Sequence, residues 1–283
     1  MAIDDDRLRG RSGPDASTDV RSRRADRPHG VFITGASTGV GAALARHYGA
    51  LGAAVGLFAR RHDALAALLS TLPSDRASIF PGDVRDAAAL RRAAGEFISR
   101  FGAPDIVIAN AGVSLGAVTD RAEDLPTFRT VLDTNVVGMV HTFAPFLASM
   151  HDAGHGTLVG IASIAGFRGL AGSGAYSASK AAAIAYLESL RLEQRGSGIA
   201  VVTICPGYIA TPMTSTNPYP MPFLIDADKA ARLIARAIER RKRFYVLPWQ
   251  MAILGRLLRV LPRPIYDAVF ARAPRKARHA NDG

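Results

Sequence analysis

The sequence contains a single cysteine, Cys205, among its 283 residues. One cysteine excludes an internal disulfide framework and any metal site built from several cysteines. It lies in an apolar stretch, so we expect a small buried core residue rather than a reactive thiol. The histidines do not have the spacing of metal ligands either, and we predict no metal site.

Long hydrophobic runs are also missing, and no uninterrupted apolar stretch reaches the roughly 20 residues that cross a bilayer. Residues 1–29 carry Asp4, Asp5 and Asp6 among scattered arginines and lack the apolar segment of a signal peptide. We interpret them as a disordered polar tail. Together with the single thiol, which fits a reducing compartment, these features predict a cytoplasmic protein.

The net charge of +11 is concentrated at one end of the chain. From Met1 to Asp228 the basic and acidic residues balance at 21 each, whereas from Lys229 to Gly283 the count is 14 against 3. This distribution does not favour a nucleic-acid partner. It fits either a basic end that meets an anionic surface or a basic face that is merely solvated.

Short apolar runs alternate with alanine-rich helical stretches between residues 30 and 247. Continuous apolar runs are typical of parallel strands buried on both faces, and the alternation predicts right-handed βαβ crossovers. The expected strands are 31–33, 53–58, 77–80, 106–109, 157–162, 199–205 and 244–247. The expected helices are 40–50, 64–72, 87–101, 125–150, 176–195 and 228–241. We predict one Rossmann-like, doubly wound α/β domain over residues 30–247, with a mostly parallel and seven-stranded sheet.

A glycine-rich turn lies between the first expected strand and the first expected helix. Its residues are Thr34, Gly35, Ala36, Ser37, Thr38, Gly39, Val40 and Gly41. Glycines permit a tight turn and let a pyrophosphate approach the backbone, and the helix N-terminus favours its charge. A tight turn without a ligand is the alternative, which the position directly after a strand disfavours.

Two arginines follow the second expected strand, where an NAD site usually has an acidic residue. A guanidinium can bind a 2′-phosphate through two hydrogen bonds. We therefore favour NADP(H) over NAD(H), with Arg60 as the first candidate contact and Arg61 as the second. Either arginine could instead face solvent at the start of a helix.

Two further motifs follow the third and fourth expected strands. They are Asp83-Val84 and Asn110-Ala111-Gly112. Both lie where a dinucleotide would pass over the carboxyl ends of the strands. An aspartate there could equally be a helix cap, and the second motif could be a plain turn.

A tyrosine and a lysine four residues apart begin the helix after the fifth expected strand. Tyr176 and Lys180 share one helix face, so an ammonium could lower the pKa of the phenol toward neutral pH. Ser163, at the end of the preceding strand, could hydrogen-bond a substrate oxygen. A surface pair on a helix is the alternative interpretation.

These motifs together resemble the short-chain dehydrogenase/reductase family, in its compact branch, over roughly residues 31–247. The resemblance rests on the glycine-rich turn, the Asn110 motif, Asn135, Ser163, Tyr176 with Lys180, and Pro206-Gly207 with Thr211. It implies an oxidoreductase that acts on CH–OH and C=O groups with a nicotinamide cofactor.

The resemblance also implies further residue roles. Asn135 would hold a water that connects Lys180 to solvent, and Lys180 would bind the nicotinamide ribose. The nicotinamide side of the cofactor would be contacted by Pro206, Gly207, Ile209 and Thr211. Relatives are commonly dimers or tetramers, so a homo-oligomer is expected.

Two alternative functions compete with a carbonyl reductase or alcohol dehydrogenase. One is epimerase or dehydratase chemistry on the same fold, whose relatives usually have a larger substrate region. The other is a regulator that senses the dinucleotide without turnover. Loss of Tyr176 or Lys180 would favour the regulator, and both are present.

The segment between Thr211 and Asp226 contains four prolines and resembles the mobile substrate lid of the family. Its apolar residues suggest an apolar carbonyl or alcohol substrate, with Phe167 as an additional wall. These residues are Tyr219, Met221, Phe223 and Leu224. A lid that packs on the core without touching substrate is the alternative.

Residues 248–283 form a basic amphipathic extension, in which apolar residues occupy one helix face and arginines flank it. This pattern fits an interfacial helix that contacts the inner face of a membrane. It fits equally well a helix that packs on its own subunit or at an oligomer interface.

Overall fold

The computed structural model describes residues 30–73, 75–217 and 219–271. A seven-stranded sheet in the order β3-β2-β1-β4-β5-β6-β9 forms its centre, and every adjacent pair is parallel. The strands are β1 (Gly30–Thr34), β2 (Ala54–Ala59), β3 (Ala77–Pro81), β4 (Ile106–Ala109), β5 (Gly156–Ile161), β6 (Ile199–Pro206) and β9 (Phe244–Leu247). The predicted Rossmann-like architecture is confirmed. The tail predicted for residues 1–29 lies outside the described residues.

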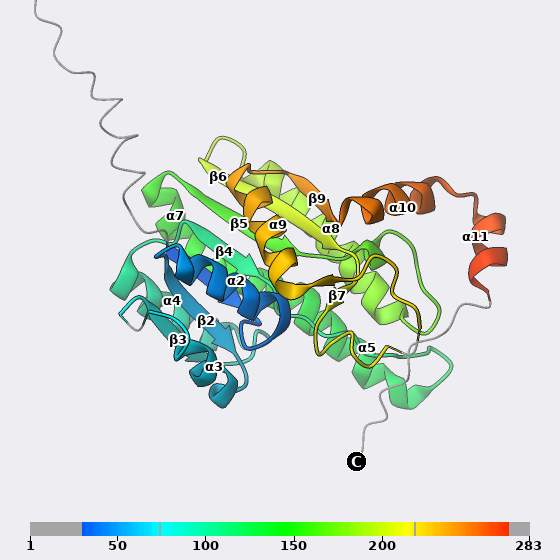
Figure 1. The fold of residues 1–283 in the computed structure, drawn as a ribbon, viewed down its shortest axis with the longest axis horizontal. Helices are drawn as coiled ribbons and strands as arrows, with labels where there is room; N and C mark the ends of the chain where they lie inside the picture. The colour runs from blue at the N-terminus through cyan, green and yellow to red at the C-terminus, as the bar shows by residue number, and fades with distance from the viewer. Residues whose placement is uncertain (1–29, 74, 218, 272–283) are drawn as a thin grey trace, which may run out of the picture.

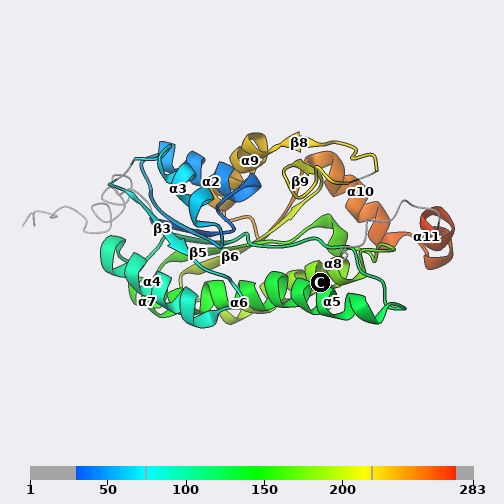
Figure 2. The same ribbon diagram turned by 90° about the horizontal axis from the view of Figure 1, so that it is seen from below.

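Helices cover both faces of the sheet, as Figure 2 shows. One layer contains α2 (Gly39–Ala50), α3 (His62–Leu69) and α9 (Ala227–Glu239). The other contains α4 (Ala87–Phe101), a segmented helical run over residues 122–153, and α8 (Gly174–Glu193). The two-residue period of β1 supplies both layers, because Val31 and Ile33 enter one core while Phe32 enters the other.

The strand order places a crevice at the centre of the sheet. The chain runs outward from β1 through β2 to β3 and then returns to β4 on the other side of β1. The loops after β1 and β4 therefore diverge in opposite directions at the carboxyl ends of the strands. Such a switch point is where open α/β sheets bind ligands.

The helix expected over residues 125–150 is not regular. It is divided into α5 (Leu125–Leu132), a π-helical turn η2 (Asp133–Val137), α6 (Gly138–Phe143), a 3₁₀ turn η3 (Ala144–Phe146) and α7 (Leu147–Ala153). Pro145 lies in η3 and cannot donate a backbone hydrogen bond, which accounts for the second break. The prediction of one regular helix is wrong at both turns.

Within the described part of the chain, the helical stretch Ala122–Ala153 is long and apolar enough to pass as a membrane span by length and composition. Charged residues such as Arg129 and Asp133 interrupt its apolar runs, so it was not predicted from the sequence. Of its apolar window, 44% is buried inside the protein. Core helices of soluble proteins meet the same criterion, so this finding by itself assigns no location.

The last third of the chain forms a loop and two terminal helices. A small two-stranded sheet of β7 (Ile209–Ala210) and β8 (Ile225–Asp226) closes the proline-containing loop at its base. After β9 the chain forms α10 (Trp249–Val260) and α11 (Arg263–Phe270). Both helices lie at the end of the molecule that also carries the loop (Figures 1 and 2).

Candidate active site

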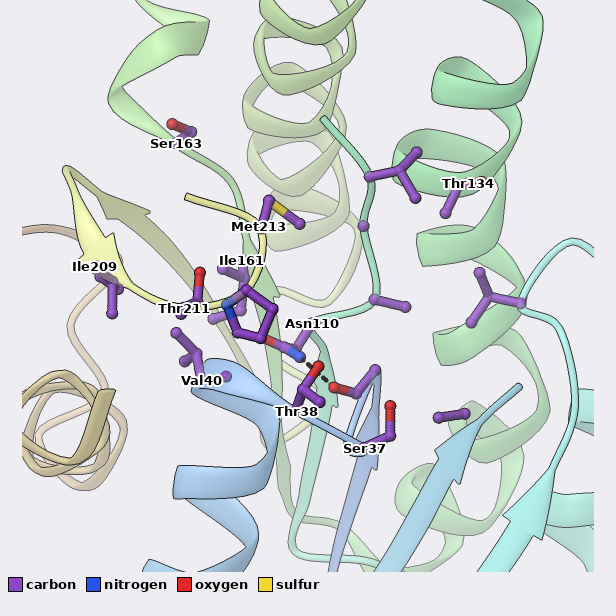
Figure 3. Close-up of a pocket in the computed structure, with 18 of the residues that line it drawn as sticks. Ser37, Thr38, Val40, Asn110, Thr134, Ile161, Ser163, Ile209, Thr211 and Met213 are labelled. Carbon is purple, nitrogen blue, oxygen red and sulfur yellow. Dashed lines mark hydrogen bonds between the residues drawn. The ribbon is translucent and has the colours of Figure 1, made fainter. Parts of the chain in front are cut away.

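A cavity of about 460 Å³ lies over the carboxyl ends of the central strands. Ser37 and Thr38 lie toward one end of it and Ser163 toward the other, with Asn110 and Thr211 between them (Figure 3). The cavity therefore connects the glycine-rich turn to the segment after β5. This is the path that the sequence motifs predicted for a dinucleotide.

The glycine-rich turn packs so closely on its surroundings that a side chain would not fit at Gly35 or at Gly41. Gly35 has φ +66°, and a Cβ atom there would lie 2.7 Å from the Cα of Ala111. A Cβ atom on Gly41 would collide with the carbonyl oxygen of Gly35. Asn110 fixes the turn by donating from Nδ2 to the carbonyl oxygens of Thr34 and Gly35, each at 3.1 Å. These contacts keep the backbone exposed toward the cavity.

The N-terminus of α2 provides the electrostatics of an anion site. Its first turn carries no acidic residue, and the side chains of Ser37, Thr38 and Val40 line the cavity beside it. The first amides of a helix have no partner within the helix and favour a negative group. The turn thus fits the pyrophosphate of a dinucleotide.

The arginines after β2 lie against this end of the cavity. Nη2 of Arg61 is 3.4 Å from the Ser37 hydroxyl and 3.3 Å from the Thr38 hydroxyl, to which it donates. Arg60 also lines the cavity and is exposed. Of the two arginines, Arg61 is the one with hydrogen bonds to the turn, although Arg60 was the first candidate from the sequence.

Asp83 lies at the same end and is paired with Arg85. Nη2 of Arg85 donates to Oδ2 of Asp83 at 2.7 Å, and Nε donates to both carboxylate oxygens at 3.1 Å. The hydrogen bonds from Arg85 hold the pKa of the Asp83 carboxyl below its usual range. The carboxylate of Asp83 is therefore ionised at neutral pH, and both Asp83 and Val84 line the cavity.

Tyr176 and Lys180 lie on the first turns of α8, at the opposite end of the cavity. Nζ of Lys180 is 5.8 Å from the centre of the Tyr176 ring, so the two side chains are neighbours. Nζ donates a hydrogen bond to the carbonyl oxygen of Ile161 at 2.8 Å. Burial lowers the pKa of Lys180 to about 8.

The electrostatics of the phenol differ from the sequence interpretation. Burial raises the pKa of Tyr176, a hydrogen bond with Ser163 opposes this change, and the nearby Tyr219 adds to it. The sequence suggested that Lys180 lowers the pKa of the phenol. In the structure the effect of burial is larger, and it raises this pKa. The Lys180 ammonium is oriented by its hydrogen bond to the carbonyl oxygen of Ile161. Burial has the largest effect on the pKa of Tyr176 and raises it.

Asn135 lies behind the cavity, in the π-helical turn η2. Its Oδ1 accepts from the backbone amide of Val113 at 2.8 Å, and its Nδ2 donates to the carbonyl oxygen of Val113 and to the Ser179 hydroxyl, each at 2.9 Å. Ser179 donates in turn to the carbonyl oxygen of Tyr176 at 2.8 Å. The buried amide thus links η2 to the backbone of α8.

Most of the residues singled out from the sequence line one cavity. They are Gly35, Ser37, Thr38, Gly39, Val40, Arg60, Arg61, Asp83, Val84, Asn110, Ala111, Gly112, Ser163, Tyr176, Lys180, Pro206, Gly207, Ile209 and Thr211. Thr34, Gly41 and Asn135 are not in the lining. Thr34 is fully buried and its hydroxyl accepts from the amide of Asn110, so it supports the turn from below.

Several lining residues were not singled out from the sequence. They include Val113, Thr134, Ile161, Ala162, Met213 and Thr214. Val113 directly follows the Asn110 motif, and Met213 and Thr214 follow Thr211, so adjacency to known motifs was the available signal. Thr134 likewise directly precedes Asn135, although the π-helical turn that contains both residues was not predicted.

The apolar residues suggested for the substrate region separate into two groups. Tyr219 lies close enough to Tyr176 to raise the pKa of its phenol, and its ring centre is 6.4 Å from that of Tyr208. Phe167 is not among the residues that line the cavity, and its ring stacks on that of Phe244 with 6.1 Å between the ring centres. Phe223 is 49% exposed and faces solvent.

Comparison with known proteins agrees with this geometry. The sequence model of the short chain dehydrogenase family matches residues 29–220. An uncharacterized oxidoreductase of Myxococcus xanthus is 40% identical over 246 residues, which span 86% of this chain and 96% of the relative. A crystal structure of a short-chain dehydrogenase from Streptomyces avermitilis superposes with a TM-score of 0.72 and 27% identity, covering 87% of this chain and 95% of the other. A crystal structure of an actinorhodin polyketide ketoreductase variant with NADPH has a TM-score of 0.71 and 25% identity, covering 78% and 95%.

Proposed function

Because the chain belongs to the short-chain dehydrogenase family of oxidoreductases, as its motifs predicted, we propose that it interconverts a ketone or aldehyde with an alcohol and prefers NADP(H). The main support is the position of Tyr176, Lys180 and Ser163 in the cavity that begins at the glycine-rich turn. A phenol, an ammonium and a hydroxyl around one reacting oxygen suit proton transfer to and from that oxygen.

The residues present fit a dinucleotide along the whole cavity. The N-terminus of α2 would hold the pyrophosphate, and Asp83 with Val84 would lie beside the adenine half. Lys180 would hold the nicotinamide ribose, while the segment from Pro206 to Thr211 would contact the nicotinamide side. When bound, the cofactor supplies or accepts the hydride.

The preference for NADP(H) rests on the charges after β2. Arg61 is already oriented toward the Ser37 and Thr38 hydroxyls, and Arg60 is exposed next to it. A 2′-phosphate carries charge that guanidinium groups bind through paired hydrogen bonds. The NADPH named for the actinorhodin ketoreductase structure agrees with this preference.

In the reductive direction Tyr176 would give its phenolic proton to the substrate oxygen. A phenol with an ordinary pKa near 10 keeps its proton at neutral pH, and burial raises that pKa further, so Tyr176 is protonated and available as the acid. The Ser163 hydroxyl would donate a hydrogen bond to the same oxygen as its charge grows. Lys180, with a pKa of about 8, could return a proton toward Tyr176 near neutral pH.

We infer an apolar substrate from the loop between β7 and β8. Met213 lines the cavity, and Tyr219 is close enough to affect the pKa of Tyr176. An apolar loop over a proton-transfer site favours an apolar carbonyl compound over a charged one. The ketoreductase activity named for the actinorhodin neighbour agrees with a ketone as the reacting group.

We also propose a homo-oligomer, a dimer or a tetramer, formed through the helices around η2 and α8. Val137 and Val140 are partly exposed on this helical layer, as is Leu192 at 60%. Apolar side chains exposed on neighbouring helices suit a helix-to-helix interface. Sedimentation velocity of the full chain measures the subunit count.

The experiment that tests the proposal has two stages. A fluorescence titration with NADPH and NADH gives the affinity for each cofactor, and a panel of ketones and aldehydes is then followed by the nicotinamide absorbance. We expect tighter binding of NADPH and turnover of an apolar ketone. Tight cofactor binding with no turnover of any carbonyl or alcohol would favour a nucleotide-sensing regulator instead.

A further inference from the structure

The helices α10 and α11 expose large apolar side chains, which together we call the C-terminal stripe. It consists of Trp249, Ile253, Leu257, Val260, Ile265 and Val269. The first four follow the helical repeat of i, i+4, i+8 and i+11 and therefore lie on one face of α10. Trp249 is 68% exposed and Val260 is 76% exposed.

The opposite face of α10 is packed on the protein, so the stripe is not simply the side of a detached helix. Met251 is 1% exposed and packs on Gly207, where an added Cβ atom would lie 2.6 Å from its Cγ. A Cβ atom added to Gly255 would lie 2.6 Å from the ring of Phe167, so the glycine allows this ring to pack closely on α10. The apolar residues of α10 therefore divide into a buried face and an outer face.

Arg168 fastens both terminal helices to the segment that follows Ser163. Its Nη1 donates to the carbonyl oxygens of Leu258 and Leu261 at 3.0 and 2.9 Å, near the end of α10. Its guanidinium lies 4.0 Å from the ring centre of Tyr266, whose hydroxyl donates to the carbonyl oxygen of Gly169 at 2.7 Å. These contacts hold the C-terminal stripe at a fixed place on the surface.

The charges around the stripe have one dominant sign. Residues 249–271 contain three basic residues, Arg256, Arg259 and Arg263, and one acidic residue, Asp267. Arg256 and Arg263 are exposed, while Arg259 lies over the Phe167 ring at 5.1 Å. A binding partner that covers the C-terminal stripe must therefore offer both an apolar surface and negative charge.

We propose that the C-terminal stripe is a docking surface for an anionic lipid bilayer. A bilayer interface buries apolar side chains, accepts tryptophan at the level of the headgroups, and attracts arginines through anionic lipids. A second copy of the chain fits less well, because a symmetric contact through this face would bring the arginines of one copy toward those of the other. The loop between β7 and β8, which contains the exposed Phe223 and Leu224, extends toward the same end of the molecule (Figures 1 and 2).

Trp249 gives this proposal a direct test, because it is the one tryptophan of the chain and lies in the stripe. Its emission is recorded as vesicles are added, once with phosphatidylcholine alone and once with phosphatidylcholine containing phosphatidylglycerol. We expect a blue shift with the anionic vesicles that decreases as NaCl is raised. The measurement uses no substrate or cofactor, so it succeeds or fails independently of the proposed oxidoreductase function.

A matched pair of variants tests whether vesicle binding depends on the C-terminal stripe or on any exposed leucine. Leu257→Ser removes a stripe residue that is 57% exposed, and Leu51→Ser removes a leucine that is 63% exposed after α2. We expect Leu257→Ser to weaken partitioning to anionic vesicles roughly tenfold and Leu51→Ser to leave it unchanged.

No blue shift with anionic vesicles, or equal losses in both variants, overturns the proposal. A blue shift that grows with protein concentration without lipid, and disappears in Leu257→Ser, would instead assign the stripe to a second copy.

Discussion

Nζ of Lys180 donates a hydrogen bond to the carbonyl oxygen of Ile161 at 2.8 Å. The lysine is 5% exposed, and burial lowers its pKa from 10.5 to about 8. One neutral acceptor does not offset the removal of an ammonium from water. The folded protein therefore binds this proton less tightly than the unfolded chain does.

This relationship predicts how stability depends on pH. The unfolded chain holds the Lys180 proton up to a pH near 10.5, and the folded protein releases it near pH 8, so the contribution of Lys180 to stability increases across that window. Between pH 7.5 and 9.5 the parent should gain about 2 kcal/mol of unfolding free energy relative to Lys180→Met. Denaturant unfolding of both proteins at a series of pH values measures the difference. Parallel pH profiles for the two proteins would show that Lys180 keeps its ordinary pKa.

The arginines after β2 should decide cofactor choice. Arg61→Ala removes the guanidinium that donates to Ser37 and Thr38, and we expect NADPH binding to weaken roughly tenfold to a hundredfold with NADH binding unchanged. Arg60→Ala should act in the same direction. Fluorescence titration gives both affinities, and Arg91→Ala, on the exposed side of α4, is the control. A loss of NADH affinity equal to that of NADPH would rule out a contact specific to the 2′-phosphate.

Ser179 is expected to position Tyr176, the residue proposed to transfer the proton. Its hydroxyl accepts from Asn135 and donates to the carbonyl oxygen of Tyr176, so Ser179→Ala leaves a buried amide with one partner fewer. We expect a loss of about 1–3 kcal/mol in unfolding free energy and a lower kcat with little change in cofactor affinity. Ser179→Thr, which keeps a hydroxyl, should recover part of kcat. Ser189→Ala, whose hydroxyl bonds the exposed Glu193, is the matched control.

Arg168 should determine how firmly the terminal helices are held. Arg168→Met removes the hydrogen bonds to Leu258 and Leu261 and the contact with the Tyr266 ring. We expect amide hydrogen exchange in α10 and α11 to accelerate roughly tenfold or more, while the central strands stay protected. Arg256→Met alters an exposed arginine of α10 and should leave the exchange unchanged. Equal protection of α10 in both variants would show that Arg168 does not fasten it.

The strands and the site could largely be predicted from the sequence because both depend on local patterns. Buried parallel strands appear as apolar runs, and the motifs that follow them meet at one edge of the sheet whatever the details of packing. For this reason Gly35, Asn110 and Tyr176 were placed correctly along one cavity although they are far apart in the chain.

The remaining features depend on contacts that leave no local signal. Arg168 reaches carbonyl groups 90 and 93 residues away, and nothing near it in the sequence indicates them. The π-helical turn around Asn135 interrupts a stretch that has ordinary helical periodicity. The pKa of Tyr176 was predicted in the wrong direction because spacing on a helix reveals a neighbouring charge but not the degree of burial.

Substitution of the phenol tests the central claim most directly. Tyr176→Phe keeps the ring and removes the group proposed to carry the proton, so NADPH affinity should be retained while kcat for a ketone accepted by the parent falls roughly 10²–10⁴-fold. Both quantities come from one preparation, by fluorescence titration and by the nicotinamide absorbance. A Tyr176→Phe variant that binds NADPH normally and reduces the ketone as fast as the parent would contradict the account.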